Sequence, residues 1–250
     1  MKRNFDRPTL FTLLAMAALC CGPAVTSADT PAVEPLPVNV FKNLKAGKKQ
    51  TVIAYGTSLT AGGEWTKSLQ DYLDKHYPGQ VTFLNAAKNG MHSNWGVANF
   101  QERVLAKKPD LVFIEFSIND ANTKNAVSLE KSGANLDRMV KAVRQQNPDA
   151  DVVLQTMNLA WDSPVVKGKT YGSDRKNLVT YYDVYRQYAT KHGLPLVDNL
   201  PAWQKLLQDD RAAYEKKVPD GIHPDSSASV DVTWKAIETM LEKARAAADK

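Results

Sequence analysis

The chain has 250 residues, of which 43% are hydrophobic and 24% charged, a composition typical of a globular protein and unlike that of a disordered or collagen-like chain. A chain of this length buries enough surface to form one stable domain without disulfides or a structural metal. Its 32 Lys and Arg against 27 Asp and Glu give a net charge of +5 without a basic run, so no nucleic-acid partner is expected.

Residues 1–28 have the pattern of a secretory signal peptide. Lys2, Arg3 and Arg7 precede an apolar stretch over residues 10–19, and small residues follow up to Ala28. The stretch is shorter than the roughly 20 residues of a transmembrane helix, so no transmembrane segment is expected in the mature chain; a buried N-terminal helix is the alternative. We therefore expect an exported protein, periplasmic or secreted, with a linker and N-terminal extension at residues 29–47 and one domain at residues 48–250.

Both cysteines of the chain, Cys20 and Cys21, lie inside this N-terminal segment. A mature chain cut after Ala28 can therefore form no disulfide. Lipid attachment at Cys20 or Cys21 is the alternative. It is less favoured because Leu19 stands where lipoprotein signals place a small residue.

From residue 51 onward, short apolar runs alternate with longer segments of helical periodicity, as in βαβ units around a parallel sheet. The apolar runs predict strands at residues 51–55, 81–84, 111–116, 151–155 and 194–197. Predicted helices between them carry apolar stripes, such as Trp65 with Leu69 and Leu136 with Met139. Tyrosines in a predicted helix at 175–192 have the spacing of a face packed on the sheet, and the last helix is predicted at 226–247.

The first predicted strand runs directly into a turn that contains Gly56, Thr57 and Ser58. Because parallel α/β sheets bind ligands at the carboxyl ends of their strands, Ser58 is placed to act as a nucleophile. A serine here also fits the N-cap of a helix, and the turn alone does not distinguish the two roles. The turn lacks the glycine patterns of dinucleotide and nucleoside triphosphate sites, and Thr60 stands where the nucleophile elbow G-x-S-x-G needs glycine.

A nucleophilic serine needs a base, and His223 is the best candidate among the four histidines. Asp220 precedes it in the turn sequence V-P-D-G-I-H-P, just before the last predicted helix. A carboxylate there can orient the imidazole, so Ser58, His223 and Asp220 together predict a Ser-His-Asp relay, although D-G-I-H-P alone would be only a turn. No H-x-x-x-H or C-x-x-C spacing occurs, and we expect no metal.

With these residues in place, the chain resembles a GDSL-type esterase of the SGNH hydrolase superfamily. Gly56-Thr57-Ser58-Leu59 is similar to the G-D-S-L block of that family, with Thr57 in place of the aspartate, and Asp220 to His223 matches the D-x-x-H block. The resemblance implies a three-layer α/β/α, flavodoxin-like fold with a five-stranded parallel sheet. It also implies catalysis by Ser58, Asp220 and His223 without a cofactor.

Two further blocks imply an oxyanion hole. By resemblance, Gly90 in N-A-A-K-N-G is the glycine whose N–H points at the reacting oxygen. Asn119 in S-I-N-D is the side-chain donor, with Ser117 in place of the glycine that the family has there. Together with the N–H of Ser58, these donors are expected to meet at one oxyanion. A turn or helix cap is the alternative role for Asn119.

The loops after the strands are polar with aromatic interruptions, which suits a sugar better than a long acyl chain. Thr57, His92, Trp95 and Trp161 are candidates for substrate contact, and packing is the alternative role for the two tryptophans. We expect a small-molecule or polysaccharide ester as substrate and hydrolysis of short-chain, chiefly acetyl, esters on carbohydrates through an acyl-enzyme. A broad lysophospholipase or thioesterase and an inactive carbohydrate-binding relative are the alternatives. The oligomeric state is not indicated.

Overall fold

The computed structural model describes Met1 and residues 34–250, and the compact unit spans Glu34–Lys250. Apart from Met1, the expected signal peptide lies outside the described residues, as do Cys20 and Cys21. Among the described helices, none combines the length and the apolar character that crossing a bilayer requires.

Within residues 34–250, five parallel strands form one sheet in the order β2-β1-β3-β4-β5. The strands are β1 (Gln50–Gly56), β2 (Val81–Asn85), β3 (Leu111–Glu115), β4 (Asp151–Thr156) and β5 (Leu196–Asp198). All the predicted strands are confirmed, with small shifts at their ends. This strand order is that of flavodoxin-like folds, whose ligands bind where the connections leave β1 and β3 toward opposite faces of the sheet.

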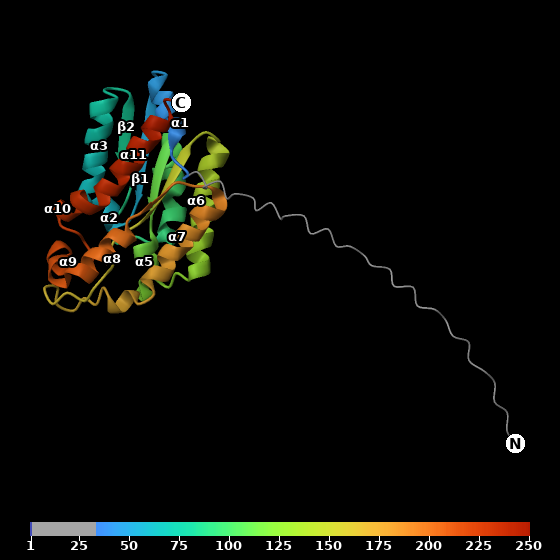
Figure 1. Ribbon diagram of the computed structural model, residues 1–250. Coiled ribbons are helices and arrows are strands. Elements are labelled where there is room, and N and C mark those ends of the chain that lie inside the picture. Colours follow the sequence, from blue (N-terminus) through green and yellow to red (C-terminus); the bar gives the residue numbers. More distant parts are fainter. Residues whose placement is uncertain (2–33) are drawn as a thin grey trace. The chain divides into compact units, whose positions relative to one another are not determined.

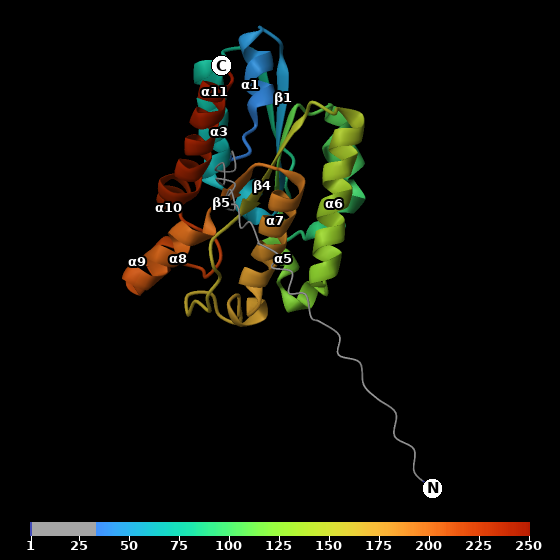
Figure 2. The same ribbon diagram turned by 45° about the vertical axis from the view of Figure 1, so that its right-hand side comes forward.

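Helices cover both faces of the sheet, which confirms the three-layer α/β/α fold. On one face lie α1 (Val38–Lys45), α3 (Glu64–His76) and α11 (Lys235–Ala247); on the other lie α4 (Ser93–Arg103), α6 (Leu129–Gln146) and α7 (Leu178–His192) (Figures 1 and 2). The remaining helices of the described chain lie in the connections: α2 (Ser58–Ala61), η1 (Leu105–Lys107), α5 (Ser117–Asp120), η2 (Thr123–Asn125), η3 (Ser173–Arg175), α8 (Leu200–Asp209), α9 (Arg211–Lys217), α10 (Ser226–Ala228) and η4 (Ser229–Trp234).

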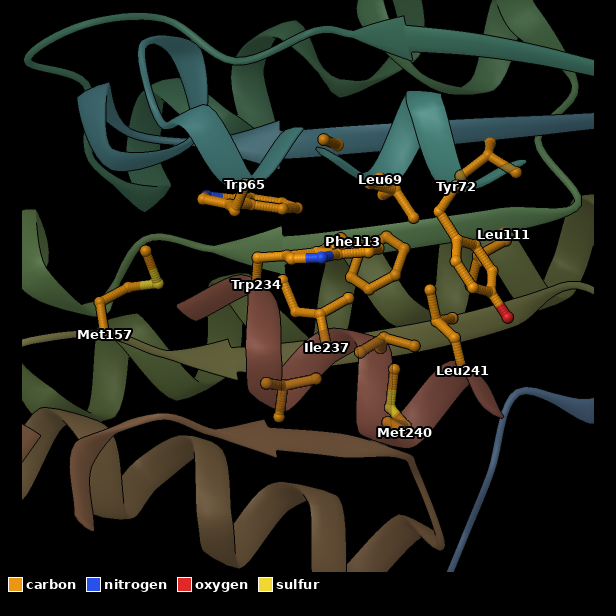
Figure 3. Close-up of a cluster of buried hydrophobic side chains, with 14 of the residues drawn as sticks. Trp65, Leu69, Tyr72, Leu111, Phe113, Met157, Trp234, Ile237, Met240 and Leu241 are labelled. Atoms are coloured by element: carbon orange, nitrogen blue, oxygen red, sulfur yellow. The ribbon is translucent and has the colours of Figure 1, made fainter. Parts of the chain in front are cut away.

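Successive side chains of the central strands point to opposite faces of the sheet, and this produces two hydrophobic cores. Val52 and Ala54 of β1 belong to the core under α3 and α11, whereas Ile53 and Tyr55 belong to the core under α4 and α6. In the first core, Trp65 of α3 packs on Phe113 of β3 with ring centroids 6.0 Å apart, and residues of α11 close the cluster (Figure 3). Both faces of the central strands β1, β3 and β4 are therefore buried, as their apolar sequences predict, whereas the edge strand β2 is partly exposed.

The last predicted helix is divided into α10, η4 and α11. The middle piece, η4, is a π-helical turn, and it places Ser229 so that its hydroxyl accepts a hydrogen bond from the backbone N–H of Trp65 (3.1 Å). That N–H lies in the first turn of α3 and has no partner within its own helix. The hydroxyl of Ser229 in this turn therefore supplies the acceptor that the Trp65 N–H does not find within α3.

The compact unit begins before the domain boundary expected at residue 48. Residues 38–45, expected in an N-terminal extension, form α1, which buries Val40, Phe41 and Leu44 in the first core. The backbone N–H of Val40 donates to Asp151 Oδ2 at 2.8 Å, which ties α1 to the start of β4. This helix is part of the folded domain.

We expect Phe41→Ala to lower the free energy of unfolding by about 3–5 kcal/mol, because the ring is fully buried and its loss leaves a cavity against Tyr77. Urea unfolding of the purified chain measures this change. Val165→Ala, at a side chain that is 74% exposed, is the control and should change little. A loss below about 1 kcal/mol for Phe41→Ala would contradict the place of α1 in the core.

Candidate active site

Three neighbouring strands deliver the predicted site residues to one edge of the sheet. Ser58 begins α2 directly after β1, Gly90 lies in the loop after β2, and Asn119 lies in α5 just after β3. The parallel pairing of β1 with both β2 and β3 brings these three strand ends together. His223 reaches the same edge from the segment between α9 and α10.

Ser58, His223 and Asp220 form a continuous hydrogen-bonded chain. His223 Nε2 lies 2.7 Å from Ser58 Oγ, and His223 Nδ1 lies 2.6 Å from Asp220 Oδ2. Backbone N–H groups of Ile222 and His223 donate to Asp220 Oδ1 at 2.9 and 2.8 Å. Burial alone would raise the pKa of Asp220, but these hydrogen bonds outweigh it and hold the pKa below the ordinary value. An ionised Asp220 keeps the imidazole proton on Nδ1, which leaves Nε2 free to take the serine proton.

The turn that carries Asp220 and His223 is supported by the segment after β4. Asn158 Nδ2 donates to Ile222 O at 2.9 Å, and the backbone N–H of Trp161 donates to Gly221 O at 2.9 Å. Gly221 has a φ of +95°, and a Cβ there would lie only 2.2 Å from Trp161 O. Only glycine fits this crossing of two backbones, so the G of D-G-I-H-P is a requirement of packing.

The predicted oxyanion-hole residues share a cavity with the serine and the histidine. A cavity of about 280 Å³ is lined by Ser58, Gly90, Asn119 and His223, together with other side chains. Gly90 is exposed with a φ of +74°, a backbone conformation that glycine adopts without strain. The Asn119 side chain is 5% exposed, and one of its Nδ2 hydrogens is donated to Met91 O at 2.9 Å. Its second Nδ2 hydrogen is available to a ligand oxygen.

Asp120 ties the loop after β2 to α5. Its Oδ1 accepts the backbone N–H of Ser93 at 2.7 Å, and its Oδ2 accepts the hydroxyl of Ser132 at 2.6 Å. Burial raises the pKa of Asp120, although these hydrogen bonds oppose the shift. Because Ser93 opens α4, this contact fixes the segment between Gly90 and α4 relative to Asn119.

The turn around Ser58 rests on a carboxyl group that the sequence analysis did not select. Glu115 at the end of β3 is fully buried, and its Oε2 accepts the backbone N–H of Thr57 (3.1 Å), the Thr57 hydroxyl (2.8 Å) and the Thr60 hydroxyl (3.2 Å). Burial raises the pKa of Glu115 to about 8, against the opposing effect of these hydrogen bonds. A charged residue inside the otherwise apolar run L-V-F-I-E-F was the signal for this position.

Thr57 is therefore a structural residue and not a substrate contact. Its side chain is fully buried, and its hydroxyl also accepts the backbone N–H of Leu59 as the N-cap of α2. The expectation of substrate contact at Thr57 is wrong, because the residue that takes the place of the family aspartate points into the protein toward Glu115.

The remaining candidates for substrate contact do not line the cavity beside Ser58. Trp95 is half-buried, with its ring centroid 5.8 Å from that of Tyr55 and the guanidinium of Arg103 over its face at 5.1 Å. His92 precedes α4 as its N-cap residue. Trp161 Nε1 donates to Val218 O at 2.7 Å, and its ring lines a second cavity. None of the three is among the residues that line the cavity of Ser58.

Arg175 is a further residue of the site that the sequence did not single out. It lines both the cavity of Ser58 and the second cavity, and it is only 5% exposed. Among residues 34–250, no three His, Cys, Asp or Glu side chains gather as a metal site would require.

The raised pKa of Glu115 predicts a pH effect on stability. Folded chains retain this proton up to about pH 8, whereas unfolded chains lose it near the ordinary value of 4.5. The stabilisation linked to the proton is fully present below pH 4.5 and is lost as the pH rises toward 8, by up to about 1.4 kcal/mol per pH unit. In Glu115→Gln this loss is absent, so the stability of the variant should rise relative to that of the wild type across this window.

Urea unfolding of both proteins at several pH values between 4.5 and 8 measures the difference. Glu102→Gln, at an exposed position of α4, is the control and should give a constant offset. A constant offset for Glu115→Gln as well would show that Glu115 does not change its protonation in this range.

Comparisons with known proteins identify the family of this chain. The model of the GDSL-like lipase/acylhydrolase family matches residues 53–229. The uncharacterized lipoprotein YqeF of Bacillus subtilis (strain 168) is 26% identical in an alignment 210 residues long, which covers 69% of this chain and 79% of that protein.

Solved structures share the fold. The acetylxylan esterase Axe2 from Geobacillus stearothermophilus superposes with a TM-score of 0.64 and 19% identity, over 78% of this chain and 94% of Axe2. The two-domain esterase CEX, which is active on acetylated mannans and was co-crystallised with mannopentaose, gives a TM-score of 0.66 and 21% identity, over 85% of this chain and 55% of CEX. The family match covers most of the sheet and the turn of Ser58. The chain belongs to the GDSL-like lipase/acylhydrolase family and is a carboxylic ester hydrolase.

Proposed function

We propose that this protein is a serine esterase that removes short acyl groups, chiefly acetyl, from carbohydrates, with Ser58, His223 and Asp220 as its catalytic triad. The observation that carries the proposal is the chain of contacts from Asp220 Oδ2 through the imidazole to Ser58 Oγ, with spacings of 2.6 and 2.7 Å. This chain borders a cavity that Gly90 and Asn119 also line.

In the first half of the reaction, the serine is acylated. His223 Nε2 takes the proton from Ser58 Oγ, which attacks the ester carbonyl carbon. The carbonyl oxygen becomes an oxyanion that accepts hydrogen bonds from the backbone N–H of Ser58, the backbone N–H of Gly90 and Asn119 Nδ2. Each such donor contributes about 3–4 kcal/mol to stabilising the transition state. When the tetrahedral intermediate collapses, the C–O bond to the alcohol breaks and His223 returns the proton to the leaving oxygen.

Deacylation repeats these steps with water as the nucleophile. His223 Nε2 takes a proton from water, the hydroxide attacks the acyl carbon, and the same donors hold the oxyanion. The bond to Ser58 Oγ then breaks, the serine regains its proton from His223, and the carboxylic acid leaves. Asp220 stays ionised throughout, because three hydrogen bonds favour its charged form.

The lining of the cavity favours a sugar. Besides the proposed catalytic residues, Asn89, Asn122, Asn125 and Tyr171 line it. Amide groups match sugar hydroxyls, and an aromatic ring can pack on a sugar face. A volume of about 280 Å³ suits one substituted sugar better than a long acyl chain. Axe2 is named an acetylxylan esterase and CEX is described as active on acetylated mannans, which supports the same substrate class.

The proposal predicts acetate release from acetylated polysaccharides that depends on Ser58. Ser58→Ala should lower kcat at least about a thousandfold, because the nucleophile is lost while the fold is kept. The measurement is acetate release from acetylated xylan, mannan and pectin, with p-nitrophenyl esters of increasing chain length in parallel. Ser227→Ala, at an exposed serine outside the cavity, is the matched control and should keep full activity.

The same experiment separates the alternatives. A preference for medium or long acyl chains would indicate a lysophospholipase or thioesterase. Binding of glycans without any release of acetate would indicate an inactive carbohydrate-binding relative. Either outcome would overturn the proposed activity.

We also propose export directed by a signal peptide at residues 1–28, followed by a linker to the domain. The basic and apolar pattern of this segment supports export, and the related YqeF is named a lipoprotein. Mass spectrometry of the chain from its native host should find a mature N-terminus at Asp29. A lipid-modified N-terminus at Cys20 or Cys21 would show anchoring instead, and an uncleaved chain would contradict export.

A further inference from the structure

Arg175 is buried, and each of its donor groups meets a protein oxygen near the cavity of Ser58. Its Nε donates to Ile118 O at 2.7 Å, its Nη1 donates to Tyr171 O at 3.2 Å, and its Nη2 donates to Asn119 Oδ1 at 3.0 Å. Two of these acceptors belong to α5, which carries Asn119, and the third belongs to the segment leading into η3. Arg175 therefore connects the loop after β4 to the side chain of Asn119.

The guanidinium has no carboxylate partner. Among residues 34–250, its hydrogen bonds end on two backbone carbonyls and one side-chain amide, and it forms no salt bridge. Its neighbour Asp174 pairs with Lys124 Nζ at 2.5 Å. The guanidinium lies over the ring of Tyr171, 5.5 Å from its centroid, but the burial of a cation without a paired carboxylate is still costly.

We propose that Arg175 is a positioning residue for the oxyanion hole, which fixes the side-chain amide of Asn119 with its nitrogen toward the cavity and polarises that amide with its positive charge. The inference rests on the proposed function, because it assigns Arg175 a part in the same reaction.

The geometry of the amide supports this role. An asparagine side chain can rotate by half a turn and exchange its oxygen and nitrogen. Here both ends are specified, because Oδ1 accepts from Arg175 Nη2 and Nδ2 donates to Met91 O. After a half-turn, Nδ2 would face the guanidinium, donor against donor, and Oδ1 would face a carbonyl. Arg175 thus prevents the orientation in which Asn119 would turn its oxygen toward the oxyanion and repel it.

The positive charge of Arg175 also favours stabilisation of the oxyanion by Asn119. As Ser58 attacks, negative charge forms on the substrate oxygen in a site that is partly shielded from water. Arg175 lies behind Asn119, so its charge polarises the amide and strengthens the donor at the moment when the oxyanion appears. The effect belongs to the transition state more than to substrate binding, which predicts a change in kcat rather than in KM.

A double-mutant cycle tests the inference with p-nitrophenyl acetate as the substrate. We expect Asn119→Ala to lower kcat by about 10²–10³-fold. Arg175→Ala should lower kcat about tenfold or more with little change in KM. If Arg175 acts through Asn119, the kcat of the double variant should lie within about twofold of the kcat of Asn119→Ala. Arg186→Ala, at an arginine of α7 paired with Asp183 and Asp198, is the matched control and should keep its kcat.

Chemical rescue of kcat distinguishes a positioning role of Arg175 from a purely structural one, because only a positioning role predicts recovery by added guanidinium. Arg175 lines two cavities, so its removal opens a space that a small cation can reach. Millimolar guanidinium should restore part of kcat to Arg175→Ala but not to the double variant, and sodium chloride at equal ionic strength should restore none. The kcat of Arg175→Lys should lie between those of the wild type and Arg175→Ala, because an ammonium group cannot reach all three oxygens. If Arg175→Ala fails to fold, Arg175→Lys in the same cycle carries the test.

Multiplicative losses in the double variant, or wild-type kcat in folded Arg175→Ala, would overturn the inference. These results are distinct from a failure of the proposed function, which would appear as wild-type hydrolysis that does not depend on Ser58.

Discussion

Hydrogen bonds to two buried carboxyl groups, Glu115 at the end of β3 and Asp120 in α5 just after it, organise the candidate active site. Glu115 accepts three hydrogen bonds from the turn that carries Ser58, and Asp120 accepts the N–H that opens α4. The segment at and just after the end of β3 therefore fixes the positions of the turn after β1 and of the loop between β2 and α4. The parallel sheet brings the strand ends together, and these carboxyl groups convert that proximity into a defined geometry. Burial makes their hydrogen bonds costly to break, since an unpaired group would lie in a dry interior.

Periodicity and motifs were sufficient to predict the fold and to single out the residues of the proposed relay. Apolar strands buried on both faces leave a strong pattern, and all of them were found. The turn with Ser58 and the spacing of Asp220 and His223 were also visible, because a strand end and a turn restrict where a side chain can go. The structure then places these side chains within hydrogen-bonding distance.

Other residues depend on contacts between distant segments and left little trace in the sequence. Thr57 was expected to touch substrate, but the carboxyl group it faces comes from a strand far along the chain. Trp161 is of a residue type that often contacts sugars, yet its indole and backbone N–H groups donate hydrogen bonds to the turn before His223. Arg175 begins a predicted helix without any motif. In each case the partner is set by tertiary packing, which local patterns do not encode.

The crossing of Trp161 with Gly221 has a consequence for how this protein can be altered. The segment after β4 supplies no member of the proposed triad, but hydrogen bonds from the Asn158 side chain and the Trp161 backbone hold the turn that carries Asp220 and His223. A chimera that takes its last helices from one homologue and its central loops from another would separate the two halves of this brace. Exchange of both segments as a single module preserves it, which makes this pair of loops the natural unit for recombination.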